Sequence, residues 1–261
     1  MLATQPRREQ QGEQVADCLA QNPFPTDKAL SSSLSLVVQA NPKGELPEQK
    51  EIANYTDHWP STMRVSSKFV LSAHSPAQFP APLIPEVAFL GRSNVGKSSL
   101  LNALLGSKQA KVSSTPGRTR AINFFSITDR PERQQPQIYF ADLPGYGYAK
   151  ISKSISAEWP KFIEPYLAER TTLALCLCLV DSNIPPQQPD IQLIEFLKHT
   201  GRELIVVATK SDKLSGNGRA KAQSALRKGL QVEDVLLCSA KTGAGLKELW
   251  ATIRSAAGNE V

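Results

Sequence analysis

The pattern of apolar and polar positions changes near residue 66. Beyond it, short apolar runs alternate with longer segments in which apolar residues recur at helical spacing. The runs predict strands at Lys68–Ser72, Glu86–Leu90, Ile122–Ile127, Gln137–Ala141, Leu173–Val180, Leu204–Ala208 and Asp234–Cys238. The longer segments predict helices at Lys97–Leu105, Ile155–Glu169, Pro189–His199, Arg219–Lys228 and Leu246–Ala256. Such alternation indicates a three-layer α/β domain, a mostly parallel sheet covered by helices on both faces. Ligands of such sheets bind at the carboxyl ends of the strands.

Residues 1–65 lack this periodicity. They are rich in Gln, Pro, Ser and Asn, and their 6 Lys and Arg nearly balance 8 Asp and Glu. This composition is typical of a chain that cannot bury enough apolar surface to fold. We therefore expect a flexible N-terminal extension at residues 1–65, followed by one folded domain at residues 66–261.

The positive charge belongs to the predicted domain. From residue 66 onward, 24 Lys and Arg stand against 16 Asp and Glu, a net charge of +8. Such an excess favours an anionic partner such as RNA, although bound nucleotide phosphates would account for part of it.

Cysteine usage and hydropathy bear on the compartment. The four cysteines form no CxxC pair, and a disulfide scaffold is not expected in a chain of this size. Cys176 and Cys178 share one side of a predicted strand, where packing in the core is favoured over a metal pair. The longest apolar run, Leu173–Val180, is far shorter than a membrane span. We expect a cytoplasmic protein without a membrane partner.

The strongest motif lies between a predicted strand and helix. The segment Gly91–Ser98 reads GRSNVGKS and matches the P-loop pattern GxxxxGK[ST] in its required context. Its backbone N–H groups and the helix N-terminus suit nucleotide phosphates. Lys97 would add a positive charge at the β- and γ-phosphates, and the Ser98 hydroxyl is a candidate magnesium ligand.

A second motif, Asp142–Gly145 (DLPG), follows the strand at Gln137–Ala141. An acidic residue at this strand end suits a magnesium contact, usually through water. Gly145 can offer its N–H to the γ-phosphate and move when that phosphate leaves.

Two later loops predict the base specificity. Thr209-Lys210-Ser211-Asp212 ends a strand, and its Asp212 carboxylate can accept from the N1–H and amino group that guanine presents. Many GTPases have Asn in place of Thr209, so we expect a less braced loop and modest affinity. Ser239-Ala240-Lys241 ends the last strand, where a backbone N–H would contact guanine O6.

The segment Ser113–Arg120 lies between the P-loop and DLPG and is predicted to be the first switch. Its Thr119, just before the strand, is favoured over Thr115 as the threonine that reaches magnesium. Arg118 and Arg120 would either bind rRNA phosphate or steady the loop.

Together these motifs resemble a known family. GRSNVGKSSLLNALL, TPGRTRAINFF, DLPGYGYAK, TKSDKL and SAKTGAGL are similar to the EngB-type GTPases, also called YihA or YsxC. The resemblance covers about residues 66–256 and does not extend to the N-terminal extension. It implies a GTPase that acts in assembly of the large ribosomal subunit, and a need for it in normal cell division and septation.

The resemblance also implies a site. Magnesium ligands fall on Ser98 and Thr119, and the catalytic set is Lys97, Thr119 and Gly145. The implied nucleotide contacts are Gly91, Arg92, Ser93, Asn94, Val95, Gly96, Lys97, Ser98, Gly117, Arg118, Thr119, Arg120, Ala121, Asp142, Leu143, Pro144, Gly145, Thr209, Lys210, Ser211, Asp212, Cys238, Ser239 and Ala240.

The expected reaction is magnesium-dependent hydrolysis of GTP to GDP and phosphate by a monomer. Many GTPases place Gln after DxxG to orient water, but this chain has Tyr146, which predicts slow intrinsic turnover. Potassium could supply charge instead, with Asn94 as a ligand, or Asn94 could only brace its loop. Tyr146, Tyr148, Lys150 and Lys153 would either face RNA or protein or pack locally.

Two other functions fit parts of the pattern. One is a guanine-nucleotide switch that binds a division or membrane protein, although the chain has no amphipathic anchor. The other is an ATP-using P-loop enzyme, against which Asp212 argues.

Overall fold

The structure is a computed structural model that describes residues 65–110, 121–128, 135–147 and 161–258. The strands are β1 (Ser66–Ala73), β2 (Glu86–Gly91), β3 (Ile122–Thr128), β4 (Ile138–Asp142), β5 (Leu173–Asp181), β6 (Leu204–Thr209) and β7 (Val235–Leu237). The helices are α1 (Lys97–Leu105), α2 (Ile163–Glu169), α3 (Gln188–His199), α4 (Gly216–Leu230) and α5 (Leu246–Ala256). The predicted extension lies outside the described residues, so it and its boundary stay predictions.

All seven strands form one sheet in the order β1-β3-β4-β2-β5-β6-β7. β2, β4, β5, β6 and β7 run parallel, whereas β3 is antiparallel to both of its neighbours, β1 and β4. The prediction of a mostly parallel sheet is confirmed. The order places β2 between β4 and β5. At β2 the strand order reverses: β4, β3 and β1 lie on one side of it, and β5, β6 and β7 on the other. Ligands bind at such points in open α/β sheets.

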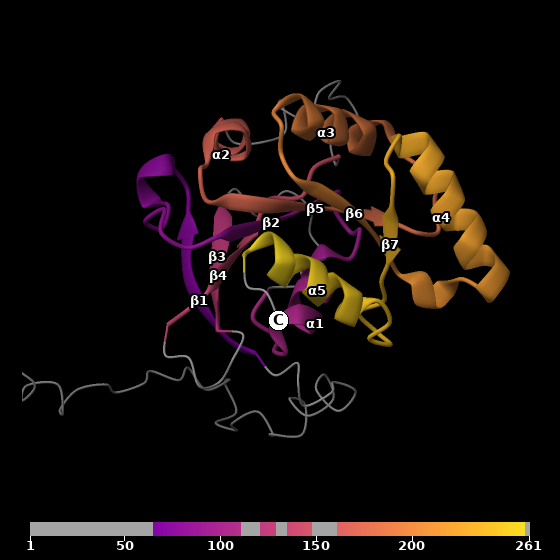
Figure 1. The fold of residues 1–261 in the computed structure, drawn as a ribbon, viewed down its shortest axis with the longest axis horizontal. Helices are drawn as coiled ribbons and strands as arrows, with labels where there is room; N and C mark the ends of the chain where they lie inside the picture. The colour runs from indigo at the N-terminus through magenta and orange to yellow at the C-terminus, as the bar shows by residue number, and fades with distance from the viewer. Residues whose placement is uncertain (1–64, 111–120, 129–134, 148–160, 259–261) are drawn as a thin grey trace, which may run out of the picture. The chain divides into compact units, whose positions relative to one another are not determined.

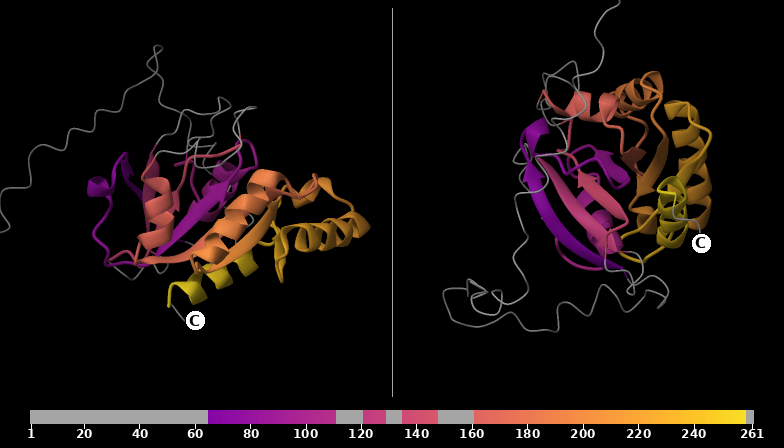
Figure 2. Two further views of the ribbon diagram at one scale, coloured as in Figure 1. Left: turned by 90° about the horizontal axis from the view of Figure 1, so that it is seen from above. Right: turned by 60° about the vertical axis from the view of Figure 1, so that its left-hand side comes forward.

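Helices cover both faces of the sheet, which gives the three predicted layers (Figure 1). α1 and α5 lie on one face and share a core with Phe89, Phe140 and Leu177 of the sheet. α2, α3 and α4 lie on the other face, packed on residues such as Leu90 and Cys178 (Figure 2). Both faces of β2 are therefore buried, as its continuous apolar run requires.

One predicted helix begins later than expected. The prediction spanned Ile155–Glu169, but residues 161 and 162 form a turn and α2 starts at Ile163. Residues 155–160 lie outside the described part of the chain. Pro160 argues against one continuous helix over the predicted range, because proline in a helix interior lacks the N–H and clashes with the preceding turn. Pro165 is tolerated because it stands in the first turn of α2.

α4 is longer than its prediction at both ends. The glycines of its first turn read as loop, yet the Ser215 side chain caps the helix by accepting from the Gly218 N–H at 3.2 Å. At its other end, Leu226 and Leu230 are buried against the sheet. A cap and tertiary packing outweigh the low helix propensity of glycine here.

Cys176 and Cys178 are buried in β5, as the core interpretation predicted. Burial raises the pKa of the Cys176 thiol to about 12. Within the described ranges no group of three or more His, Cys, Asp or Glu could hold a metal ion.

Candidate nucleotide-binding site

The P-loop follows β2 at the point where the strand order reverses. β2 ends at Gly91, and α1 begins at Lys97, as predicted. The loop is closed internally by the Val95 N–H, which donates to the Arg92 carbonyl at 3.2 Å. It is also tied to the DLPG segment, because the Ser93 N–H donates to the Tyr146 carbonyl at 3.0 Å. The predicted phosphate loop therefore has the required strand-loop-helix geometry.

Asn94 has a left-handed backbone conformation, with φ of 64°. Asn is among the few residues other than glycine that tolerate this conformation. Its side chain is exposed and makes no hydrogen bond to another described residue. Its carbonyl instead accepts from the Lys210 amine at 2.8 Å. At this position the backbone carbonyl of Asn94 braces the loop, and the Asn94 side chain is exposed to solvent.

Lys97 and Asp142 form an ion pair at the mouth of the site. Lys97 is the first residue of α1, and Asp142 is the last of β4. Their side chains are only 12% and 9% exposed. The structure thus brings together the predicted phosphate-binding lysine and the predicted magnesium-contacting carboxylate, with Ser98 next in the chain.

The DLPG segment rests directly on the P-loop. The Leu143 N–H donates to the Phe89 carbonyl at 3.2 Å and continues the pairing of β4 with β2. A Cβ at Gly145 would lie 3.2 Å from Ser93 Oγ and 3.3 Å from its backbone nitrogen. Only glycine lets the two loops approach this closely without displacement.

Asp212 is held by the last predicted loop. Ser239 is fully buried, and its hydroxyl donates to Asp212 Oδ1 at 2.7 Å. Ser239 Oγ in turn accepts from the N–H groups of Lys241 and Thr242, each at 3.2 Å. This hydrogen bond from Ser239 is the main cause that lowers the pKa of Asp212. The carboxylate is therefore ionised at neutral pH and oriented before a base arrives.

Lys210 connects three loops. The Lys210 backbone is in the left-handed conformation, with φ of 59°. The Lys210 amine donates to Asp181 Oδ2 at 2.7 Å as well as to the Asn94 carbonyl. Asp181 also accepts from Asn183, at 3.0 Å from the backbone and 2.9 Å from the side chain. Sequence reasoning missed Asp181 and Asn183. The available signal was their position at the carboxyl end of a parallel strand beside the P-loop strand.

Thr209 corrects the expectation of a poorly braced loop. Its buried hydroxyl lies 2.5 Å from the Val95 carbonyl and 3.1 Å from the Val180 carbonyl. The hydroxyl therefore joins the Thr209–Asp212 loop to the P-loop. We expected this loop to lack such a brace, because Thr209 has no side-chain amide. The physical basis for expecting modest affinity is removed.

Tyr146 packs locally and does not face a partner. It is 1% exposed, and its hydroxyl donates to Asp190 Oδ1 at 3.1 Å. Of the two alternatives, local packing is therefore correct for Tyr146. Tyr148, Lys150 and Lys153 lie outside the described residues.

The predicted first switch is also outside the described ranges. Ala121 is buried just before β3, but Gly117, Arg118, Thr119 and Arg120 are not described. Their assigned roles, including magnesium binding by Thr119, stay predictions.

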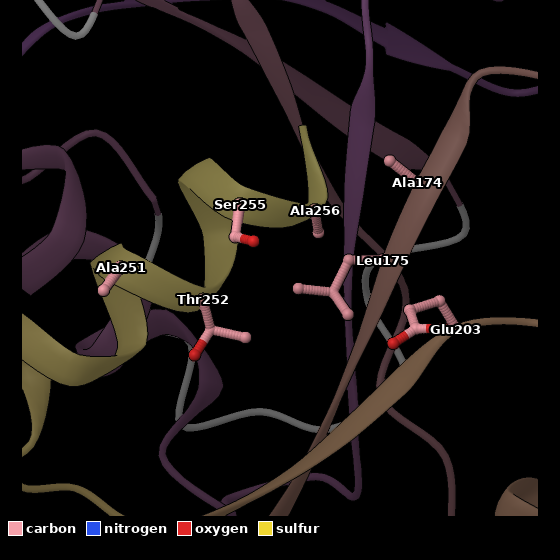
Figure 3. A pocket seen from close by; sticks show the side chains of 7 residues that line it. All are labelled: Ala174, Leu175, Glu203, Ala251, Thr252, Ser255 and Ala256. Atoms are coloured by element: carbon pink, nitrogen blue, oxygen red, sulfur yellow. The ribbon is translucent and has the colours of Figure 1, made fainter. Parts of the chain in front are cut away.

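A cavity of about 620 Å³ lies elsewhere. It is lined by Leu175 at the start of β5, Glu203 before β6, and Thr252 and Ser255 of α5 (Figure 3). These positions are at the amino ends of the strands, whereas the P-loop, DLPG and the two base-specificity loops follow carboxyl ends. The cavity is therefore separate from the candidate site.

Comparisons with known proteins agree with this geometry. Residues 86–210 match the profile of the family described as "50S ribosome-binding GTPase". A protein of Acidobacterium capsulatum named "Probable GTP-binding protein EngB" is 72% identical over 195 residues, which cover 75% of this chain and 92% of that protein.

Solved structures share the fold. The crystal structure of a probable GTP-binding protein EngB matches with a TM-score of 0.52 at 23% identity, over 67% of this chain and 100% of that one. Era in complex with MgGDPNP and a 16S ribosomal RNA fragment matches with a TM-score of 0.53 at 28% identity, over 66% of this chain and 56% of that one. With these likenesses and an intact set of described motifs, this chain belongs to the EngB family of GTP-binding proteins and is a P-loop GTPase.

Proposed function

We propose that this GTPase binds GTP with magnesium and hydrolyses it slowly, as a step in assembly of the large ribosomal subunit. The observation that carries the proposal is the convergence of two arrangements at one sheet edge. Lys97 and Asp142 meet beside the P-loop, and Ser239 orients Asp212 at the guanine loop. One arrangement suits phosphates and the other a guanine base.

The donor set fits magnesium. Mg²⁺ takes oxygen ligands, keeps several waters and is bound through one or two protein groups together with substrate phosphates. Ser98 supplies a hydroxyl in the first turn of α1, and Asp142 supplies a carboxylate that is paired with the preceding residue, Lys97. Thr119 is the proposed second hydroxyl. Bound magnesium would neutralise charge on the β- and γ-phosphates.

The protein's own contribution to hydrolysis is positioning and charge. Lys97 would exchange Asp142 for phosphate oxygens as the nucleotide enters, while the loop N–H groups hold the phosphates. Tyr146 does not replace the water-orienting Gln, because its side chain is buried and bonded to Asp190. Slow turnover follows, with a partner needed to complete the site.

Potassium is expected to accelerate hydrolysis more than sodium. The exposed Asn94 side chain lies in the P-loop, where its oxygen can serve as a cation ligand. The measurement is single-turnover hydrolysis in matched chloride salts, with Asn94→Gly as the variant that keeps the left-handed backbone. Equal wild-type rates in both salts would reject the prediction. A potassium effect that persists in Asn94→Gly would place the ligand elsewhere.

The proposed partner is the large ribosomal subunit or its precursor. The description of the matching family and the +8 charge from residue 66 onward support it. Normal cell division and septation would then depend on the protein through ribosome supply. In the described ranges no helix is long and apolar enough to cross a membrane.

α4 offers a candidate RNA-facing surface. The helix contains four Lys or Arg residues and no Asp or Glu. Lys221 and Lys228 stand seven residues apart and share one face, and Arg227 is adjacent to Lys228. All three are exposed, and none forms an ion pair with another described residue. We define Lys221, Arg227 and Lys228 as the basic face of α4.

We expect neutralisation of this face by Lys221→Gln, Arg227→Gln and Lys228→Gln to weaken large-subunit binding about tenfold near 0.1 M salt. The plot of log affinity against log salt should lose about two to three units of slope, because each phosphate contact releases counterions. Binding is measured by gradient sedimentation with a GTP analogue and with GDP.

The matched control removes three exposed lysines elsewhere, by Lys68→Gln, Lys161→Gln and Lys247→Gln. GTP hydrolysis should be unchanged in both triple variants. An equal loss of large-subunit affinity in both triple variants would show that net charge, and not the basic face of α4, causes the effect. Wild-type binding that is the same with GTP analogue and GDP would remove the switch from the proposal.

A further inference from the structure

Three residues from distant parts of the chain meet behind the P-loop. Arg92 Nε lies 3.1 Å from Asp190 Oδ1 and 3.0 Å from Oδ2, and the Tyr146 hydroxyl donates to Oδ1 at 3.1 Å. Arg92 belongs to the P-loop, Tyr146 follows DLPG, and Asp190 is in the first turn of α3. The three form a network, named here the Arg92–Asp190–Tyr146 network, that joins both phosphate loops to a helix.

The network is buried. The side chain of Asp190 is 2% exposed, Tyr146 is 1% exposed, and the Arg92 side chain is 19% exposed. A buried carboxylate without partners is strongly unfavourable, so Asp190 holds both partners firmly. Burial, with the Asp190 charge as the next cause, raises the pKa of Tyr146 well above its ordinary value. The tyrosine therefore stays protonated and donates to Asp190.

The network lies one residue from the predicted γ-phosphate contact. Besides its hydroxyl bond, Tyr146 pairs with the P-loop through its backbone, forming a parallel bridge with Arg92. On its other side, Gly147 has φ of 76°, and a Cβ there would come within 3.2 Å of the Arg92 side chain. Gly145 precedes Tyr146. Its position is therefore fixed by the backbone pairing of Tyr146 with Arg92 and by the bond from the Tyr146 hydroxyl to Asp190.

We propose that Asp190 is a positioning residue, which holds Arg92 and Tyr146 so that the Gly145 N–H points to the γ-phosphate of GTP. The inference rests on the proposed role of Gly145. Its consequence is selective: GDP has no γ-phosphate, so a loosened turn weakens binding of GTP analogues and hydrolysis while GDP binding is kept.

The fold contains a matched control for this network. At the other end of β2, buried Glu86 accepts from the Tyr166 hydroxyl at 2.8 Å and from Arg170 Nε at 2.8 Å. It has the same chemistry: a buried tyrosine donates to a buried carboxylate that is paired with an arginine. It lies at the amino end of the strand and touches no nucleotide motif.

The experiment compares Tyr146→Phe with Tyr166→Phe. Each removes one buried hydroxyl, so both should lower the thermal midpoint of unfolding. Only Tyr146→Phe should lower affinity for a non-hydrolysable GTP analogue, by about tenfold, while GDP affinity stays within about twofold. Its single-turnover hydrolysis rate should fall in parallel. Tyr166→Phe should keep the wild-type ratio of the two affinities.

Asp190→Asn provides a second measurement, because it keeps the size of the side chain but loses the charge that pairs with Arg92. It should shift the same ratio in the same direction. An unchanged ratio in Tyr146→Phe and Asp190→Asn would overturn the inference, as would an equal shift in Tyr166→Phe. Failure of the wild type to bind either guanine nucleotide would instead reject the proposed function, and is seen before any variant is made.

Discussion

Asp212→Asn is expected to weaken GTP binding about a hundredfold. In the proposed site the carboxylate would accept two hydrogen bonds from guanine, and a hydrogen bond to a charged group contributes about 1.5–3 kcal/mol. The amide presents a donor where guanine also presents one. Xanthosine nucleotides carry a carbonyl in place of the amino group, so their affinity for the variant should rise. The measurement is equilibrium competition among GTP, XTP and ATP.

Two controls separate charge from orientation in that experiment. Asp234→Asn neutralises another acidic residue outside the nucleotide motifs and should leave base preference unchanged. Ser239→Ala keeps the Asp212 carboxylate but removes the hydroxyl bonded to it, so it should give a smaller loss without a gain for XTP. Wild-type GTP affinity in Asp212→Asn would show that the base contact is elsewhere.

Lys97→Met is expected to abolish hydrolysis, with a loss of about a thousandfold in single-turnover rate. The same substitution leaves the largely buried Asp142 without its cation, which destabilises the fold by about 3 kcal/mol. Adding Asp142→Asn removes the uncompensated charge. The double variant should therefore recover much of the thermal midpoint measured without nucleotide, while its hydrolysis stays lost.

That separation distinguishes a catalytic role of the Lys97–Asp142 pair from a purely structural one. Recovery of hydrolysis together with stability in the double variant would show that Lys97 is needed only to neutralise Asp142. A Lys97→Met protein as stable as the wild type would show that the ion pair contributes nothing before nucleotide binds.

The elements were predictable where the chain's local pattern decides them. β2 and α1 agree with their predictions to within a residue, because continuous burial and the P-loop motif fix both. α4 and α2 differ at their ends, where a serine cap, core leucines and Pro160 outweigh periodicity.

The described nucleotide motifs were predictable for the same reason, since the P-loop, DLPG and the two base-specificity loops each follow a strand in the expected order. Their supports were not. Asp190 meets Arg92 across 98 positions in the chain, and Thr209 meets Val95 across 114. Such pairs depend on the sheet order β4-β2-β5-β6, and no local spacing encodes them. The expectation of a poorly braced loop at Thr209 was wrong because it compared only the residue types Thr and Asn. The partner of the Thr209 hydroxyl, the Val95 carbonyl, is set by the fold.

The hydrogen bonds from Thr209 and Lys210 to the P-loop backbone also bear on how the two halves of a nucleotide are recognised. They make the base-binding loop and the phosphate-binding loop parts of one rigid support. A nucleoside and a pyrophosphate each lose their own translational and rotational freedom when they bind to this support, whereas an intact nucleotide loses it once. The binding free energies of the two separate fragments should therefore add up to clearly less than the binding free energy of GTP. This is positive cooperativity within a single ligand.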